Sequence, residues 1–172
     1  MGISFGGDDL VTAVYTNGDT NTLKAGSGLS LYVGGMVTPL WIGDAAGFGV
    51  VGNIGWKYDN VGGKNADISF SRFPWLLGLQ TLIRASEHGY ISIAGGATKE
   101  PGARLAGSGD ISGQADLQSQ LGWMGELGSY VSSGSHSAWG IGLRYTKVHY
   151  SFGGETIDGS NLGLHFTLHV NP

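Results

Sequence analysis

The sequence "NLGLHFTLHV", residues 161–170, alternates strictly between two kinds of side chain. Leucine, phenylalanine and valine occupy the even positions from 162 to 170, and glycine, histidine and threonine occupy the odd positions between them. Successive residues of a β-strand point to opposite faces of a sheet, so this alternation predicts a strand with one apolar and one polar face. In a soluble sheet the apolar face forms the core. In an outer-membrane barrel it faces lipid, and the polar face fills the interior.

Strand-like runs of this kind recur along the chain, whereas helical periodicity is almost absent. Turn-rich segments separate eight runs, which are residues 9–16, 23–38, 47–59, 68–84, 90–99, 116–131, 138–151 and 161–170. The connections 39–46, 85–89 and 132–137 are short or flanked by apolar residues, whereas 17–22, 60–67, 100–115 and 152–160 are more polar and richer in glycine. This alternation is typical of outer-membrane barrels, with the short set periplasmic and the polar set extracellular. We predict a single domain over residues 1–172.

Glycine is the most unusual feature of the composition. The chain has 33 glycines in 172 residues, and only 13% of its residues are charged; ordinary soluble domains have roughly 7% glycine and about a quarter charged residues. Polar faces crowded with glycine suit a narrow eight-stranded barrel, because its interior has little room for side chains. The net charge of −4 disfavours nucleic acid as a partner, and the lack of cysteine excludes disulfides and thiolate metal sites.

The apolar faces carry the large side chains. Aromatic residues lie toward the strand ends, at Trp41, Trp56, Tyr58, Trp139 and Tyr145, as in the interfacial girdles of membrane barrels. We therefore predict an all-β fold, an eight-stranded antiparallel up-and-down transmembrane β-barrel. Its outward set, Leu31, Ile54, Trp123, Leu143 and Leu164, should be exposed, and the run 116–131 places Leu117 and Leu121 on the same outward face. In a soluble barrel or sandwich, the alternative, these side chains would be buried.

Three stretches carry a family resemblance. They are "FGGDDLVTAVYTNGDTNTLKAGSGLSLYVGG" (5–35), "NADISFSRFPWLLGL" (65–79) and "GIGLRYTKVHYSFGGETIDGSNLGLHF" (140–166). They resemble a family of small, largely uncharacterised proteobacterial outer-membrane β-barrel proteins. The resemblance implies an eight-stranded barrel in the outer membrane of a Gram-negative bacterium, and it implies no particular activity. Such barrels usually end on an aromatic residue, whereas this chain ends "HVNP".

Charged residues on the polar faces define one candidate site. Glu126 and Arg144 fall on neighbouring strands, within reach of a salt bridge, and Lys57, Arg84 and His165 lie on or near polar faces. Charges in an interior of low dielectric constant must be paired and hydrogen-bonded. We interpret these five residues as a polar network that fills the barrel, with a narrow ion path as the alternative. No spacing of histidines with acidic residues predicts a metal site.

Pro74 interrupts an apolar run in the segment "SRFPW", residues 71–75. Proline removes a donor from the strand ladder and is usually found at bulges or edges. Phe70 and Trp75 are five residues apart, so strict alternation would put these two aromatic side chains on opposite faces. We interpret the segment as a structural bulge.

The segment "KVHYS", residues 147–151, gives an enzymatic alternative. His149 and Ser151 share the parity of the outward residues, and a His-x-Ser pair on the outside of a small barrel is similar to the arrangement in lipid A deacylases. A serine nucleophile needs a histidine base, and the histidine needs a carboxylate to orient it. Only the loop residues Glu155 and Asp158 could supply that carboxylate. We predict that no such triad forms.

The combined pattern favours an integral outer-membrane barrel with a structural or surface-interaction role and no catalytic activity. Outer-membrane lipid or lipopolysaccharide is the expected partner, the surface ligand is unknown, and the barrel is expected to be a monomer without cofactors. The alternatives are an acyl hydrolase acting on lipid A through His149, Ser151 and Glu155, and a narrow pore.

Overall fold

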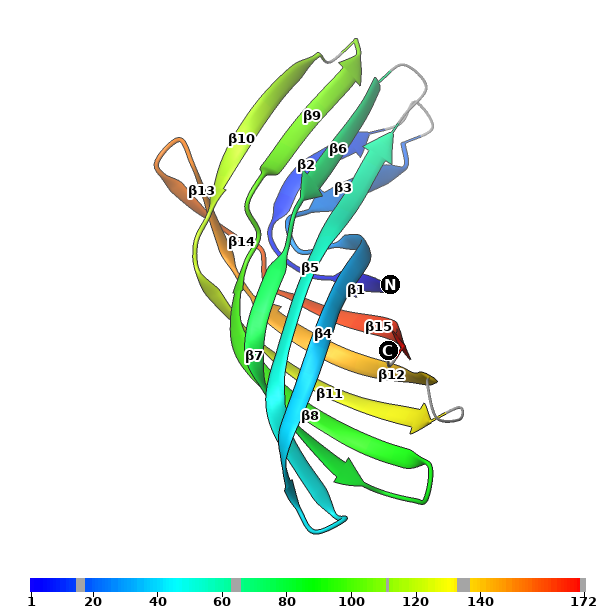
Figure 1. Ribbon diagram of the computed structural model, residues 1–172. Coiled ribbons are helices and arrows are strands. Elements are labelled where there is room, and N and C mark those ends of the chain that lie inside the picture. Colours follow the sequence, from blue (N-terminus) through cyan, green and yellow to red (C-terminus); the bar gives the residue numbers. More distant parts are fainter. Residues whose placement is uncertain (15–17, 63–65, 111, 133–136, 171–172) are drawn as a thin grey trace.

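A closed antiparallel β-barrel organises the chain (Figure 1). The computed structural model describes residues 1–14, 18–62, 66–110, 112–132 and 137–170. Eight of the strands in these ranges form the barrel: β1 (Gly2–Phe5), β4 (Gly28–Ile42), β5 (Ala46–Gly62), β7 (Trp75–Arg84), β8 (Gly89–Lys99), β11 (Gly122–Ser132), β12 (Ser137–Lys147) and β15 (Asn161–Val170). Around the barrel the order is β4-β1-β15-β12-β11-β8-β7-β5, and pairing of β5 with β4 closes the ring. The described residues form no helix long and apolar enough to cross a membrane.

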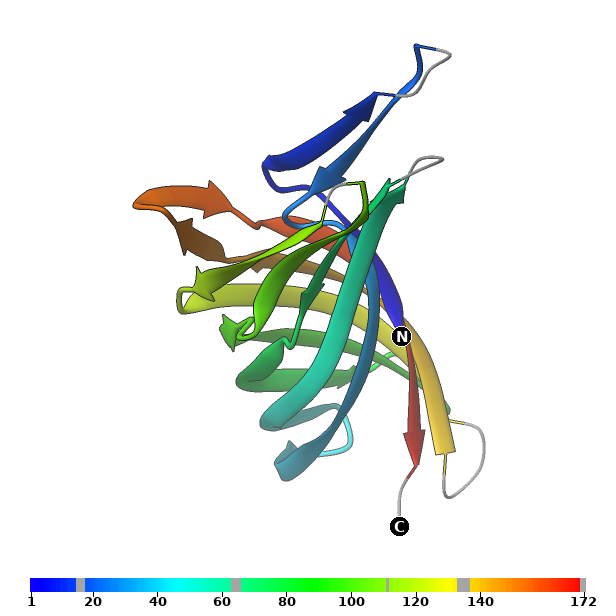
Figure 2. The same cartoon turned by 90° about the horizontal axis from the view of Figure 1, so that it is seen from above.

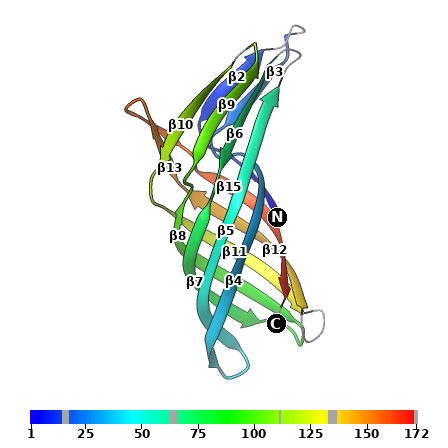
Figure 3. The same ribbon diagram turned by 45° about the horizontal axis from the view of Figure 1, so that its top comes forward.

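Beyond one end of this barrel, here called the upper end, the chain continues as an extended sheet (Figure 3). The upper part of β5 pairs with β6 (Ala66–Arg72), and the sheet continues through β9 (Ala103–Gly109), β10 (Gly113–Ser119), β13 (His149–Phe152) and β14 (Glu155–Asp158). A separate hairpin, β2 (Asp9–Val14) and β3 (Thr20–Lys24), projects at the same end (Figure 2). The four connections predicted to be extracellular therefore lie together. Most of their residues form strands instead of loops, and Asn17 at the first turn lies outside the described residues.

The first barrel strand is not where the sequence places it. Residues 9–16 were expected to enter the barrel, but β2 pairs only with β3 in a two-stranded sheet. The barrel is closed instead by the four-residue strand β1, in which Gly2 is opposite His165 on one side and Ser30 on the other. A half-exposed hairpin alternates in the same way as a membrane strand, so its pattern alone does not distinguish the two.

The predicted bulge at Pro74 is also wrong. The pairs Lys57↔Arg72 and Ile54↔Trp75 belong to one continuous register with β5, so no residue is inserted. Phe70 is buried and Trp75 is exposed, as strict alternation across this segment requires. Phe70 therefore faces the interior, and its aromatic character reflects the apolar core of the upper end.

An irregularity occurs instead in two neighbouring strands at the upper end of the barrel. Between β11 and β10 the inward face passes from Met124 to Leu117, which are an odd number of residues apart and are both buried. On β8 and β9, Thr98 and Ala103 are likewise an odd number of residues apart and both buried. Leu117 was expected to face outward with Leu121, and this extra residue turns it into the core.

The interior of the molecule has two regions. The upper region is apolar, and its buried residues are Leu23, Ala25, Val61, Phe70, Ala103, Leu117, Val148 and Tyr150. The lower region, inside the closed barrel, is lined largely by polar side chains and glycine. The outer wall is apolar: Leu31, Ile54, Trp123, Leu143 and Leu164 are 45–63% exposed. This result confirms the predicted exposure of the outward set and excludes the soluble alternative in which they form a core.

Candidate functional site: the barrel interior

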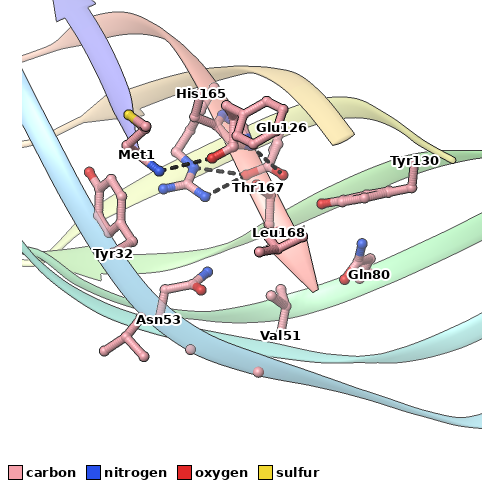
Figure 4. Close-up of a pocket in the computed structure, with 15 residues that line it drawn as sticks. Met1, Tyr32, Val51, Asn53, Gln80, Glu126, Tyr130, His165, Thr167 and Leu168 are labelled. Carbon is pink, nitrogen blue, oxygen red and sulfur yellow. Dashed lines mark hydrogen bonds and ion pairs between the residues drawn. The ribbon is translucent and has the colours of Figure 1, made fainter. Parts of the chain in front are cut away.

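The lower half of the barrel contains a chamber of about 180 Å³ (Figure 4). Six of the eight barrel strands contribute to its lining, which includes Tyr32, Asn53, Gln80, Glu126, Tyr130, Arg144, His165 and Thr167. Glycine makes this space possible at several points. A methyl group at Gly142 would lie 2.6 Å from Cε1 of His165, and one at Gly34 would collide with the backbone of the neighbouring strand at Gly52.

A charged trio crosses one wall of this chamber. Glu126 on β11 lies opposite Arg144 on β12, and the guanidinium Nε donates to Oε2 of the carboxylate at 2.8 Å. On the next strand, Nε2 of His165 lies 3.2 Å from Oε1 of the same carboxylate. Figure 4 shows the side chains of Glu126 and His165 close together in this wall. Both carboxylate oxygens are therefore engaged, and three adjacent strands are joined through one residue.

Arg144 also contacts the aromatic ring of Tyr32. The Arg144 guanidinium lies 5.0 Å from the centre of the Tyr32 ring, which comes from β4 on the other side of β1 and β15. A cation over an aromatic face is attracted by the ring's electrons. The pair extends the contacts of the charged trio toward β4.

A second ionic cluster lies higher, where the polar chamber meets the apolar core. Arg72 donates through Nε to Glu100 at 2.9 Å, and the hydroxyl of Tyr150 donates to the same carboxylate oxygen. Lys57 donates to the carbonyl oxygen of Gly26 at 2.7 Å, and Arg72 also donates to the carbonyl of Ser27. All four side chains are almost fully buried. They fasten the connection between β3 and β4 across the inside of the barrel.

Close backbone packing completes this closure. Gly26 donates its N–H to the carbonyl of Gly6 at 3.0 Å, and Ser4 Oγ donates to the carbonyl of Gly26 at 3.0 Å. A methyl group at Gly26 would lie 2.8 Å from the Gly6 carbonyl oxygen and 2.9 Å from that of Gly159. Three chain segments therefore meet at this glycine, with no room for a larger side chain.

The five residues predicted to form one polar network thus separate into three places. Glu126, Arg144 and His165 form the charged trio, and Lys57 belongs to the upper cluster. Arg84 does not face the interior: it is exposed at the lower end of β7, where Nη2 lies 3.4 Å from the Tyr90 hydroxyl. Its place in the predicted network is wrong, because the strand ends there and the side chain extends into solvent.

Sequence reasoning did not identify Arg72, Glu100 or Tyr150 as parts of a buried cluster. Glu100 directly follows a strand and reads as the first residue of a polar loop. The positions of Arg72 and Tyr150 could have indicated burial. Each is two residues from a buried apolar residue, Phe70 and Val148 respectively, and so falls on the same face of its strand. A charged residue on an otherwise apolar face indicates burial with a partner.

The candidate catalytic residues lie outside the barrel, on β13 and β14. Nδ1 of His149 lies 3.7 Å from Oδ1 of Asp158, which is beyond hydrogen-bond distance. Ser151 Oγ accepts instead from Nε2 of Gln120 at 3.2 Å, and Glu155 is paired in the ladder with Phe152. Within the described part of the chain, no hydrogen bond joins His149 to Ser151.

The carboxylate of Asp158 is hydrogen-bonded to Ser160 and does not orient a catalytic histidine. Partial burial favours its neutral form, but the hydroxyl and backbone N–H of Ser160 donate to the carboxylate, and His149 and Lys147 lie near it. Together these donors and cations hold the pKa of the Asp158 carboxyl below its ordinary value. The carboxylate thus serves to brace the turn between β14 and β15.

The chain is similar to the outer membrane protein OprG from Pseudomonas aeruginosa, with a TM-score of 0.47 and 16% identity over 98% of this chain and 91% of that one. No family model matches the sequence, and no curated protein matches it.

Proposed function

We propose that this protein is an integral outer-membrane β-barrel of a Gram-negative bacterium, closed to solute flow and acting through its extracellular sheet rather than by catalysis. The observation that carries the proposal is the continuous apolar outer wall around a polar interior. An isolated soluble protein rarely exposes so many large apolar side chains together. In a bilayer the same wall is matched to lipid, and strand pairing around the ring satisfies backbone groups that lipid could not, with β1 joining β4 to β15.

The height of this wall supports the membrane placement. On β11 and the residue before it, exposed apolar side chains extend from Leu121 to Val131. At about 3.4 Å per residue and a tilt of about 40°, that stretch is about 26 Å tall, close to the roughly 25 Å apolar band of outer-membrane barrels. Trp123 and Tyr145 contact each other near the upper edge of the wall, and Trp139 lies near its lower edge. Such positions suit aromatic girdles.

Closure of the lumen favours a structural or interaction role over a pore. The charged trio and Tyr32 line the chamber, and the cluster around Arg72 and Glu100 lies above it with the apolar core beyond. An ion would have to displace salt-bridged side chains and then cross a tightly packed apolar region. The extended sheet and the hairpin β2–β3 would stand outside the membrane, where they offer a structured surface to partners.

Reconstitution tests the proposal directly. The purified chain, refolded into lipid vesicles, is expected to show heat-modifiable migration on gels and resistance of the barrel strands to protease. In planar bilayers it is expected to produce no stepwise conductance. As a control, Gly26→Ala should disturb the closure between Gly6 and Gly159 and can be examined for leakage. Failure to insert would contradict the membrane placement, and stable unitary conductance of the unmodified protein would favour the pore.

A further inference from the structure

Two lysines stand at the upper edge of an otherwise apolar part of the outer wall. Lys99 ends β8 and shares the parity of the exposed residues Ile91 and Ile93. Lys147 ends β12 and shares the parity of the exposed Leu143. Both ammonium groups therefore point away from the barrel axis, at the height where the lipid headgroups would lie in the proposed orientation.

Each lysine is paired across the sheet with a tryptophan. Lys99 lies opposite Trp75 on β7, and Lys147 lies opposite Trp123 on β11. The tryptophan rings are exposed, and Trp123 contacts Tyr145 with ring centres 5.4 Å apart. Tryptophan and tyrosine prefer the membrane interface, and lysine stems extend their charge toward the headgroups. The same Lys–Trp arrangement thus occurs twice, on strands two positions apart around the barrel.

Neither lysine is neutralised by the protein. Among the described residues, no carboxylate lies within 4.0 Å of either ammonium group. Lys147 acts electrostatically on Asp158, but that carboxylate accepts from Ser160 and lies 3.7 Å from Nδ1 of His149. The outward positions of β8, β11, β12 and β15 carry no acidic residue. This part of the wall therefore presents unpaired positive charge above an apolar surface.

A groove lies lower on the same part of the outer wall. It is lined by side chains of β8, β11, β12 and β15, and it includes Leu127, Ser129, Ile141, Leu143 and Leu164. Ser129 lies between Ile91 and Ile141 on the two neighbouring strands, and its short side chain makes the hollow. Leu143 is four residues below Lys147, which is about 13 Å along the strand. A charged headgroup at the lysines would therefore have its acyl chain at the depth of the groove.

We infer that this surface, formed by Lys99, Lys147, Trp123 and the groove at Ser129, binds a phosphate-bearing lipid of the outer leaflet, with lipid A as the occupant. Phosphate would be held by the two ammonium groups, which bind it as point charges. One acyl chain would lie in the hollow between Ile91 and Ile141. The charge complementarity and the apolar lining both favour a lipid over a protein partner. The inference depends on the membrane placement proposed above.

Native mass spectrometry of the refolded protein in detergent, titrated with diphosphorylated lipid A, tests this site. The double variant Lys99→Gln/Lys147→Gln is expected to bind lipid A about tenfold or more weakly, since each basic residue near an anionic surface contributes to attraction. Ser129→Leu should also weaken binding by filling the groove while both lysines remain. Lys24→Gln is the matched control, because Lys24 is paired with Asp9 on the hairpin β2–β3 and should have no effect.

A second titration, with lipid A from which the phosphates have been removed, separates the two contributions. Wild-type affinity for this lipid should fall to that of the double lysine variant. Equal binding of both lipids, or unchanged binding by the double lysine variant, would overturn the inference. Heat-modifiable migration of every variant is measured in parallel. If the double lysine variant inserts normally and still binds lipid A as the wild type does, the lipid site is refuted and the membrane placement stands. If the wild-type chain does not insert, the membrane placement itself is refuted.

Discussion

The carboxylate of Glu126 on β11 contacts side chains from two other strands, β12 and β15. Its Oε2 accepts from Nε of Arg144 at 2.8 Å, and its Oε1 lies 3.2 Å from Nε2 of His165. Arg144 in turn stacks on Tyr32, so the contacts extend from β11 through β12 and β15 to β4. One buried carboxylate therefore links the polar side chains of the barrel interior, and its removal should disturb the packing of several strands.

Glu126→Gln should destabilise the barrel by about 3–5 kcal/mol, because it leaves the Arg144 charge stranded in the interior. Arg144→Met should have a cost of similar size for the opposite reason. The double variant should cost less than the sum of the two, since neither charge is then unpaired. Urea unfolding in lipid vesicles, followed by tryptophan fluorescence, measures these free energies. Additive costs would show that the two side chains are not coupled.

Two adjacent glycines should respond differently to the same substitution. A methyl group at Gly34 would collide with the carbonyl oxygen of Gly52 and the side chain of Asn53, so Gly34→Ala should destabilise by about 1–3 kcal/mol. Gly35 faces outward with nothing within 4 Å, so Gly35→Ala should be neutral or slightly stabilising. The same unfolding titration compares them. Equal effects would argue against the inward packing at Gly34.

The sequence was most informative where alternation was uninterrupted. Residues 139–145 and 162–168 keep one parity throughout, and the structure exposes their large apolar side chains as predicted. Parity also placed Glu126 and Arg144 on the polar faces of neighbouring strands, and the structure sets these two residues directly opposite each other. A long, strict alternation predicts the exposed face reliably, because a slip of one residue would move every side chain of the strand to the wrong face.

Local exceptions to alternation were less predictable. The extra residue in the β10–β11 region turns Leu117 inward, and nothing in the sequence between 117 and 123 marks it clearly. The strand β1 is too short for a recognisable pattern, and its place in the barrel depends on pairing with residues near the other end of the chain. The cluster of Arg72 and Glu100 joins residues from separate strands, so it required the three-dimensional arrangement.

Depth in the membrane should determine the effect of a charge on the outer wall. Leu143→Arg, near the middle of the apolar band, should destabilise the barrel folded in a bilayer by about 2–4 kcal/mol. Leu121→Arg, at the upper edge, should cost about 0–1 kcal/mol, because the side chain reaches the headgroups. Folding efficiency into vesicles, read from heat-modifiable migration, measures the difference. Equal tolerance of both arginines would contradict the proposed placement of the band.

The final prediction concerns the enzymatic alternative at the rim. A serine nucleophile requires its hydroxyl within about 2.6–3.2 Å of a histidine nitrogen, with some looseness allowed before substrate binds. His149 and Ser151 are two residues apart on one strand, which separates their Cα atoms by about 6.6 Å. Ser151 is already a partner of Gln120, and the imidazole lies toward Asp158 instead. We therefore expect the purified barrel in mixed micelles with lipid A to release no fatty acid.

Mass spectrometry of the extracted lipids measures that release, with Gln120→Ala included because it frees the Ser151 hydroxyl from its present partner. If wild-type protein liberated fatty acid, the decisive comparison would be Ser151→Ala against His149→Ala. Loss of release in both variants, with insertion unchanged, would establish a hydrolase at the rim. Release that persisted in both would point to a contaminating activity, because neither the nucleophile nor its base would then be required.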